Sequence, residues 1–230
     1  MLDFIRIACA VPAVRVGDTA KNAEDICAYI EKADGERADI VLFPELALTG
    51  YTCQDLFFQD TLWTGAQQGI RKIAGCTKNY PNVTAVVGLP VRTGMRMYNC
   101  AAVISRGKIH ALVPKTYIPN YNEFYEKRWF SSGAEVTEDL AELLGEPVPV
   151  LPRAVFRVGG TLLGVEICED LWSALPPSTF HTLAGATVIA NLSASDETVG
   201  KAEYRRALVE NQSARLLCGY LYCLLYTSPS

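Results

Sequence analysis

Short apolar runs alternate with amphipathic segments in the first third of the chain. Four segments follow one another, an apolar run, a helical pattern, a second apolar run and a second helical pattern, at residues 4–12, 18–35, 38–43 and 51–73. Asp18 can cap the first helical segment. The pattern therefore predicts a strand, a helix, a strand and a helix in that order.

The middle of the chain combines three further strands with a long irregular segment. Residues 84–91, 97–105 and 109–113 are typical of successive strands, and a tight turn joins the last two. Residues 116–133 have no regular period and carry many aromatic and charged side chains. Exposing so many aromatic rings is unfavourable unless the segment packs over something, so we expect a lid or a pocket wall there.

The last third of the chain predicts a second group of strands and helices. A hairpin spans residues 154–158 and 161–167, residues 187–191 form another strand, and a helix at 201–217 precedes a strand that begins at Gly219. Strands thus follow one another both directly and through helices. This arrangement predicts a single α/β domain with mixed sheets and helices on their outer faces.

Composition narrows the class of protein. Half of the residues are apolar, the net charge is −4, and the chain has no basic run, so a nucleic-acid partner is not expected. No apolar run approaches the length of about 18 residues that spans a membrane. The chain also starts without a basic and apolar leader, so we expect a cytoplasmic protein with no membrane partner.

One cysteine differs from the others in its surroundings. The eight cysteines form no C-x-x-C pair, so they are expected to be reduced, mostly buried thiols rather than a metal or redox site. Cys168 follows the apolar run 161–167 and precedes Glu169 and Asp170. It therefore lies at the carboxyl end of a predicted strand, where α/β sheets bind ligands. A small apolar residue that merely ends a strand is the competing interpretation.

Two more reactive side chains occupy equivalent places. Glu45 and Lys115 each follow a predicted buried strand. A carboxylate can take the proton of a thiol, and an ammonium ion can stabilise both the thiolate and the oxyanion that forms when it attacks an amide. The backbone N–H of Glu169 can assist, and the carboxylate can protonate the leaving amine. Glu45, Lys115 and Cys168 therefore suffice for amide hydrolysis through a thioester.

A cysteine–histidine mechanism is the main competitor, but the chain has only two histidines. His110 lies inside a predicted strand and His181 follows a Pro-Pro pair, so both are expected to be partly exposed structural residues. Glu45 and Lys115 are ordinary when taken singly, because a charge at a strand end usually faces water. The coincidence of three such groups favours the catalytic interpretation.

Several stretches of the sequence resemble the nitrilase or carbon-nitrogen hydrolase superfamily. Within it they resemble the N-terminal glutaminase domain of glutamine-dependent NAD synthetases, along nearly all of residues 1–223. The stretches are VLFPELALTGY at 41–51, VPKTYIP at 113–119, YNEFYE at 121–126, VEICED at 165–170 and ANLSAS at 190–195. The lid glutamates and the Cys-Glu-Asp run are what point to the synthetase branch.

The resemblance implies roles for seven residues. Glu45 would be the general base and acid, Lys115 would stabilise the tetrahedral intermediate, and Cys168 would be the nucleophile. Glu123 matches a lid glutamate that orients the lysine. Three more residues fall where the family holds its glutamine substrate: Tyr121, Glu169 and Ser195. For Glu123 and these three, local packing or capping is the alternative.

The resemblance also implies an architecture and a larger enzyme. The fold would be a nitrilase-type four-layer αββα sandwich that self-associates through the family's interface. Ammonia freed from glutamine would pass through a tunnel to a C-terminal synthetase domain, which uses ATP and magnesium to convert nicotinic acid adenine dinucleotide to NAD. No cofactor and no metal are expected in the present chain itself.

The end of the chain departs from the family's pattern. A strand begins at Gly219, but residues 224–230 do not continue as the family does. We therefore expect a truncated glutaminase domain over residues 1–223, with a tail at 224–230 and without the synthetase domain. An unfinished strand would leave the sheet incomplete at its C-terminal edge.

Three functions are in contention at this point. The leading hypothesis is a glutaminase domain that supplies ammonia to an NAD synthetase. The alternative is a stand-alone amidase of the same superfamily that acts on another small amide or carbamoyl compound. A nitrilase-like scaffold with a dead site is the third hypothesis, and the intact Glu45, Lys115 and Cys168 argue against it.

Overall fold

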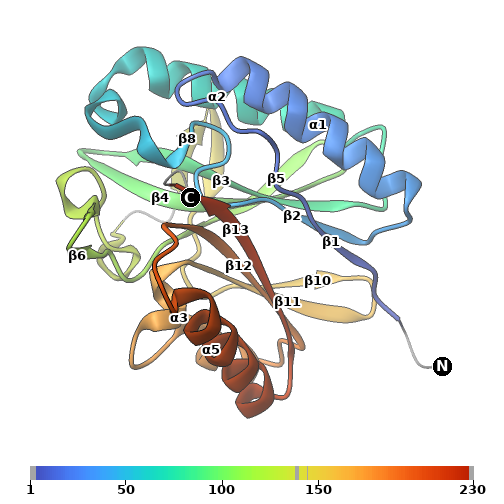
Figure 1. The fold of residues 1–230 in the computed structure, drawn as a ribbon. Coiled ribbons are helices and arrows are strands. Elements are labelled where there is room, and N and C mark those ends of the chain that lie inside the picture. Colours follow the sequence, from blue (N-terminus) through green and yellow to red (C-terminus); the bar gives the residue numbers. More distant parts are fainter. Residues whose placement is uncertain (1–3, 138–139, 144, 228–230) are drawn as a thin grey trace.

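Two β-sheets packed face to face form the centre of the molecule, and helices cover both outer faces (Figure 1). The computed structural model describes residues 4–137, 140–143 and 145–227. The layers follow the order helix, sheet, sheet, helix, which is the predicted αββα sandwich. The arrangement buries one face of each helix and both faces of each sheet.

The first sheet has five strands in the order β1-β2-β3-β4-β5. They are β1 (Ile7–Cys9), β2 (Ile40–Leu42), β3 (Thr84–Thr93), β4 (Arg96–Ser105) and β5 (Lys108–Pro114). β1, β2 and β3 pair in parallel, whereas β4 is antiparallel to both β3 and β5. β5 therefore runs in the direction of β2, and the chain leaves both strands at the same edge. Glu45 and Lys115 follow at that edge.

The second sheet has four strands in the order β10-β11-β12-β13. They are β10 (Val155–Val158), β11 (Thr161–Ile167), β12 (Val188–Ser195) and β13 (Gly219–Tyr226). β11, β12 and β13 pair in parallel, and β10 is antiparallel to β11. Cys168 follows β11 and Ser195 ends β12, so both lie at the carboxyl edge of the parallel strands.

Alternating side chains build two separate apolar layers. In β2, Ile40 and Leu42 point into the space between the sheets, whereas Val41 packs under the helices. Val165 and Ile167 of β11 face the same central space from the second sheet. This alternation is the period-two pattern of a strand that is buried on both faces. The central layer therefore holds the two sheets, and their strand ends, in a fixed relation.

Helices α1 (Thr19–Gly35) and α2 (Asp60–Cys76) cover the first sheet (Figure 1). Asp18 caps α1 as predicted, because its side chain accepts the N–H of Lys21 at 3.0 Å. The apolar residues of α1 recur every three or four positions and face the core: Ala23, Ile26, Ile30 and Ala33. The predicted helix of residues 18–35 is therefore confirmed.

Helices α3 (Glu169–Trp172), α4 (Pro177–Leu183) and α5 (Lys201–Leu216) belong to the second sheet's side of the molecule. Figure 1 shows α3 and α5 below the second sheet, on the side opposite to α1 and α2. The lid consists of the small hairpin β6 (Asn120–Tyr121) and β7 (Phe124–Tyr125), followed by two 3₁₀ turns. These turns are η2 (Glu126–Arg128) and η3 (Gly133–Glu135).

The structure differs from the sequence pattern in three places. The helix predicted from residue 51 is split into the 3₁₀ segment η1 (Tyr51–Phe58) and α2, because Gln54 has a φ of 52°. A hairpin of β8 (Leu140–Leu143) and β9 (Glu146–Pro149) was not predicted, since two prolines in the second strand argue against a strand. The strand predicted at 187–191 continues to Ser195.

The last strand pairs with its neighbour along its whole length. The register of β12 and β13 runs from Val188 opposite Gly219 to Ser195 opposite Tyr226. The strand thus passes residue 223, where we expected the domain to end, and residues 228–230 lie outside the described residues. The domain boundaries stay predictions. Within the described part of the chain, no helix is both long and apolar enough to cross a membrane.

Candidate active site

Glu45, Lys115 and Cys168 meet where the ends of the two sheets face each other. The side chains of Glu45 and Lys115 are fully buried, and Cys168 is 8% exposed. The peptide of Ala194 on β12 connects the acid to the thiol. Its N–H donates to Glu45 Oε2 at 3.0 Å, and its carbonyl oxygen accepts the Cys168 thiol at 3.6 Å. Three residues that lie far apart in sequence therefore occupy one site.

Lys115 lies between two buried carboxylates. Its Nζ donates to Glu45 Oε1 at 2.7 Å and to Glu126 Oε1 at 2.8 Å. Asn99 on β4 donates to the same Glu45 oxygen at 2.7 Å, and the Tyr51 hydroxyl donates to Glu126 Oε1 at 2.7 Å. Charges are tolerated in a protein interior when they are paired and hydrogen-bonded, and these bonds hold the cluster in one geometry.

Burial and neighbouring charges set the protonation states of the cluster. Burial raises the pKa of Glu45 to about 7, against the effect of the Lys115 ammonium. Burial alone would lower the pKa of Lys115, but the carboxylates of Glu126 and Glu45 hold it well above its usual value. Burial and the Glu45 charge raise the pKa of the Cys168 thiol, which Lys115 opposes. The resting site therefore holds a neutral thiol near a carboxyl group that exchanges its proton around neutrality.

Cys168 occupies a strained backbone position. Its φ of 46° and ψ of −99° lie in a region that residues other than glycine rarely adopt. Its N–H donates to the carbonyl of Leu192 at 2.9 Å and to Asn191 Oδ1 at 3.1 Å, both on β12. The next residue, Glu169, begins α3, where the first N–H groups have no partner within the helix. A thiol and an available N–H donor thus come from adjacent residues.

Two glycines allow the backbone to approach the acid and the lysine closely. A Cβ on Gly88 of β3 would lie 2.4 Å from Leu46 N and 2.6 Å from Pro44 O. Gly133 donates its N–H to Lys115 O at 2.7 Å, and a Cβ there would lie 2.8 Å from the same oxygen. Any side chain at either position would collide with the segments that carry Glu45 and Lys115. The sequence analysis did not identify either glycine, because both contacts join distant segments.

A cavity of about 290 Å³ opens over Cys168, between the lid and the loop that follows β12. All four predicted substrate-binding residues line it: Tyr121, Glu123, Glu169 and Ser195. Lys201 and Asp196, which form an ion pair, also line it, and the Lys201 ammonium lies 5.4 Å from the centre of the Phe124 ring. The floor of the cavity is therefore the thiol, and its rim carries charges of both signs.

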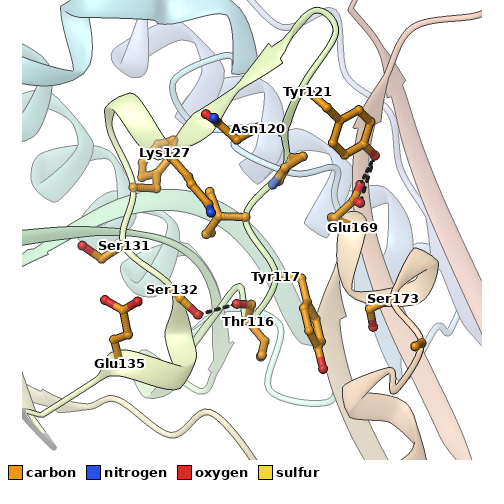
Figure 2. A pocket seen from close by; sticks show the side chains of 14 residues that line it. Thr116, Tyr117, Asn120, Tyr121, Lys127, Ser131, Ser132, Glu135, Glu169 and Ser173 are labelled. Carbon is orange, nitrogen blue, oxygen red and sulfur yellow. Dashed lines mark hydrogen bonds between the residues drawn. The ribbon is translucent and has the colours of Figure 1, made fainter.

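A hydrogen bond separates this cavity from a second, more open one of about 840 Å³ (Figure 2). The Tyr121 hydroxyl lies 2.9 Å from each carboxylate oxygen of Glu169. Both residues line both cavities, and Figure 2 shows the pair bridging from the lid to α3. Burial raises the pKa of Glu169, which the bond from Tyr121 opposes. The pair forms a polar partition on one side of the thiol.

The prediction that Glu123 orients Lys115 is wrong, because Glu126 makes that contact. The lid hairpin turns at Asn122, which has a φ of 50°, so that Glu123 is exposed on the cavity wall. Glu126 begins η2, which folds back under the lid, and it is 1% exposed. The YNEFYE stretch contains both glutamates, but only the path of the lid decides which one turns inward.

Neither histidine belongs to this cavity. His110 bonds the Ser105 hydroxyl on the neighbouring strand at 2.8 Å. His181 is fully buried on α4 beside Gly164, so the expectation that it would be partly exposed is wrong. All eight cysteines are free thiols, and five of them are buried. Within the described residues, no cluster of His, Cys, Asp or Glu could hold a metal ion.

The double sheet and the buried cluster at its edge define an α/β hydrolase of the nitrilase type. The sequence profile of the carbon-nitrogen hydrolase family matches residues 6–228, and the chain belongs to this family. It is therefore an enzyme domain of the carbon-nitrogen hydrolase class.

Within this family, the chain is related to NAD synthetases. It is 38% identical over 222 residues to the glutamine-dependent NAD(+) synthetase of Mycobacterium tuberculosis, a match that covers 95% of this chain and 32% of that protein. It is 37% identical over 214 residues to the same enzyme of Xylella fastidiosa, covering 93% of this chain and 36% of that protein. The chain thus spans about a third of the length of these relatives.

Solved structures share the fold. The glutamine-dependent NAD(+) synthetase from Cytophaga hutchinsonii has a TM-score of 0.81 and 30% identity, and the match covers 97% of this chain and 36% of that one. A mutant of a nitrilase-superfamily amidase from Nesterenkonia AN1 has a TM-score of 0.76 and 17% identity, and the match covers 98% and 77% of the two chains. The second likeness concerns the fold alone, and the predicted nitrilase-type fold is confirmed.

Proposed function

We propose that this chain is a glutaminase, which hydrolyses the side-chain amide of glutamine through a thioester on Cys168. The observation that carries the proposal is the convergence of Glu45, Lys115 and Cys168 on one cavity. Charges at strand ends usually face water, whereas these two are buried and bonded to each other. The relatedness to glutamine-dependent NAD(+) synthetases supports glutamine as the amide.

In the first half of the reaction, Glu45 takes the proton of the Cys168 thiol while the sulfur attacks the amide carbon. The oxyanion that forms is stabilised by the ammonium of Lys115 and by the N–H of Glu169. Glu45 then gives its proton to the amide nitrogen, the C–N bond breaks, and ammonia leaves behind a thioester. Glu126 lines the cavity, and its buried Oε2 has no partner among the described residues, so it can accept an N–H of the substrate amide.

In the second half of the reaction, water hydrolyses the thioester. Glu45 takes a proton from the water as the oxygen attacks the thioester carbon, and Lys115 again faces the oxyanion. The C–S bond breaks, Cys168 regains its proton from Glu45, and glutamate is released. A carboxyl group with a pKa of about 7 suits both directions of proton transfer at neutral pH.

The rim of the cavity suits the two charged groups of an amino acid. The Lys201 ammonium can pair with the substrate's α-carboxylate, and the carboxylates of Glu123 and Asp196 can bind its α-ammonium. We assign Tyr121 and Ser195 to the same recognition task, because both line the cavity beside these charges. A volume of about 290 Å³ lies near the lower end of ligand pockets, which span about 300–1,000 Å³, and therefore favours a substrate of amino-acid size.

In a longer protein like the relatives, this site would serve a second reaction. We propose that the ammonia reaches a C-terminal synthetase domain, which uses ATP and magnesium to convert nicotinic acid adenine dinucleotide to NAD. That domain, and further copies of the chain in a nitrilase-type oligomer, are the proposed protein partners. For the cavity itself we propose no cofactor, since the thiol, the carboxylate and the ammonium account for each step.

The experiment compares Cys168→Ala with Cys218→Ala, because both cysteines are 8% exposed but only Cys168 lines the cavity. A glutamine-mimicking electrophile should add once to the wild-type protein, at Cys168 by mass spectrometry. Ammonia release from glutamine should persist in Cys218→Ala and vanish in Cys168→Ala. Where a synthetase domain is present, Cys168→Ala should keep NAD synthesis from free ammonia. Glutamine hydrolysis by Cys168→Ala would show that the nucleophile is misassigned.

A stand-alone amidase is the second candidate function. The observation that favours it is that the amidase fold is matched over 77% of its length, against about a third for the synthetases. The charged rim argues for a zwitterionic substrate instead. Rates with glutamine and with a neutral amide such as propionamide separate the two: a glutaminase prefers glutamine, and Lys201→Met removes most of that preference. An unchanged rate with propionamide in Lys201→Met is the control.

A further inference from the structure

Asp170 is a buried carboxylate that accepts three backbone hydrogen bonds. It is 1% exposed. Its Oδ2 accepts the N–H of Ile167 at 2.9 Å, and its Oδ1 accepts the N–H groups of Thr116 and Tyr117 at 3.0 Å and 2.8 Å. One oxygen therefore binds the strand that leads to the cysteine, and the other binds the segment that follows the lysine.

These two segments belong to different sheets. The N–H of Lys115 donates to the Asn99 carbonyl at 2.8 Å, which fixes the lysine to the first sheet. The N–H of Cys168 donates to the Leu192 carbonyl at 2.9 Å, which fixes the cysteine to the second sheet. Neither bond crosses between the sheets. The separation of ammonium and thiol therefore depends on groups that bridge them.

Asp170 is such a bridge. Bonds from N–H groups to an ionised carboxylate are stronger than bonds between neutral groups, and three of them leave the side chain little freedom. The Tyr117 hydroxyl adds a tie in the same place, because it donates to the Leu175 carbonyl just after α3 at 3.0 Å. Figure 2 shows Thr116 and Tyr117 across from Glu169 and Ser173, so the two segments run side by side.

We propose that Asp170 is a positioning residue, which sets the distance between Lys115 and Cys168 by clamping their two backbone segments together. It does not line the cavity over the thiol, so it acts through the backbone rather than on the substrate. The inference rests on the proposed function and names what holds its two reactive groups in place. A displacement of about 1 Å at a reacting centre can lower a rate about a hundredfold.

The test compares Asp170→Ala with Glu166→Ala in the purified protein. Glu166 is the matched control, because it is also 1% exposed and lies two residues before Cys168, as Asp170 lies two residues after it. Glu166 accepts the Ser178 N–H at 2.7 Å and the Tyr220 hydroxyl, away from the lysine segment. Both variants should melt at a lower temperature. Only Asp170→Ala should lower kcat by about 10- to 100-fold while KM stays within about threefold.

The reactivity of the thiol gives a second readout. Alkylation of Cys168 by iodoacetamide is followed against pH by mass spectrometry of its peptide. Burial and Glu45 raise the pKa of this thiol, whereas Lys115 lowers it. If Asp170→Ala lets Lys115 move away, the midpoint of alkylation should rise by about one pH unit or more. Glu166→Ala should leave the midpoint in place, since a general loss of stability does not change the distance of Lys115.

Asp170→Asn covers the case in which the alanine variant does not fold. Asparagine keeps the volume and one acceptor oxygen, but it turns an NH2 group toward a backbone N–H, so the same loss of kcat and the same shift are expected. An unshifted alkylation midpoint, or a kcat equal to that of Glu166→Ala, overturns the proposal. Iodoacetamide requires no glutamine, so the shift tests Asp170 even if the wild-type protein hydrolyses a different amide.

Discussion

The floor and the rim of the cavity hold their charges under opposite conditions. On the floor, Lys115 is fully buried and lies 2.7 Å and 2.8 Å from the oxygens of Glu45 and Glu126. At the rim, Lys201 pairs with Asp196 while the two side chains keep 19% and 15% of their exposure. Water and salt weaken the rim pair and scarcely reach the floor. The same type of ion pair therefore serves two purposes.

This difference assigns separate tasks to the two regions. A dry cluster can shift the pKa of a carboxyl group to about 7 and face an oxyanion with a fixed ammonium. A hydrated pair can exchange partners with the charged ends of an incoming substrate at little loss of stability. Changes on the floor should therefore alter kcat and folding stability, and changes on the rim should alter KM. Four predictions test this division.

The largest effect is expected for Lys115→Met. Glutamine hydrolysis should fall by roughly a hundred- to a thousandfold, because the oxyanion loses its ammonium. Stability measured by urea unfolding should fall by about 3–5 kcal/mol, because two buried carboxylates lose the charge between them. Adding Glu126→Gln should recover part of the stability and none of the activity. A single variant of wild-type stability would mean that the cluster is hydrated and that the floor resembles the rim.

Gly88→Ala should damage the floor without touching a charge. The added Cβ would meet Leu46 N at 2.4 Å, so the segment that carries Glu45 must move. We expect a loss of about 1–3 kcal/mol in unfolding free energy and a fall in kcat of about tenfold or more. Gly75→Ala in α2 is the control, since a Cβ there meets nothing within 4 Å, and it should be neutral or slightly stabilising. Equal behaviour of the two variants would refute the close approach.

The pH dependence should follow Glu45. Because its carboxylate accepts the thiol proton, glutamine hydrolysis should fall about tenfold per pH unit below about 7. The folded-state pKa exceeds the ordinary value of 4.5, so the stability that Glu45 contributes is present below about 4.5 and is lost as the pH rises through about 7. Glu126→Gln should move the acid limb of the activity profile to lower pH, because the Glu126 charge helps to raise the Glu45 pKa. An unmoved limb would exclude Glu45 as the titrating group.

The smallest effect is expected at the rim. Tyr121→Phe removes the bond to Glu169 and should raise KM for glutamine by about two- to tenfold, with kcat within about twofold. Tyr125→Phe makes the same chemical change on the neighbouring lid strand, where the ring packs on Trp129, and should leave both constants unchanged. Steady-state kinetics on the two variants check the difference. A fall in kcat for Tyr121→Phe would move this tyrosine from recognition to chemistry.

Local sequence pattern predicts much of the fold, because burial repeats with the period of each element. The apolar spacing of α1 and its cap at Asp18 are read directly from neighbouring residues, and so are the strands that end before Lys115 and Cys168. The pattern fails at η1, where a positive φ at Gln54 breaks a helix that apolar spacing alone continues. It also fails at β9, where Pro147 and Pro149 hide a short strand. In both places backbone geometry overrides side-chain periodicity.

The candidate site is predictable in part for the same reason. Position at a strand end is a local property, so the chain itself singles out Glu45, Lys115 and Cys168. The choice between Glu123 and Glu126 depends on a turn in the lid, and the close approach of Gly88 depends on another strand. Neither relation is written in neighbouring residues.

The sequence by itself determined the types of element, the three reactive side chains at strand ends and the membership in a hydrolase family. Only the tertiary structure decided which charges are dry, which glutamate pairs with Lys115, and how Asp170 joins the segments of the lysine and the cysteine. The physical reason is that periodicity acts over a few residues, whereas burial and pairing depend on segments that meet only when the two sheets pack.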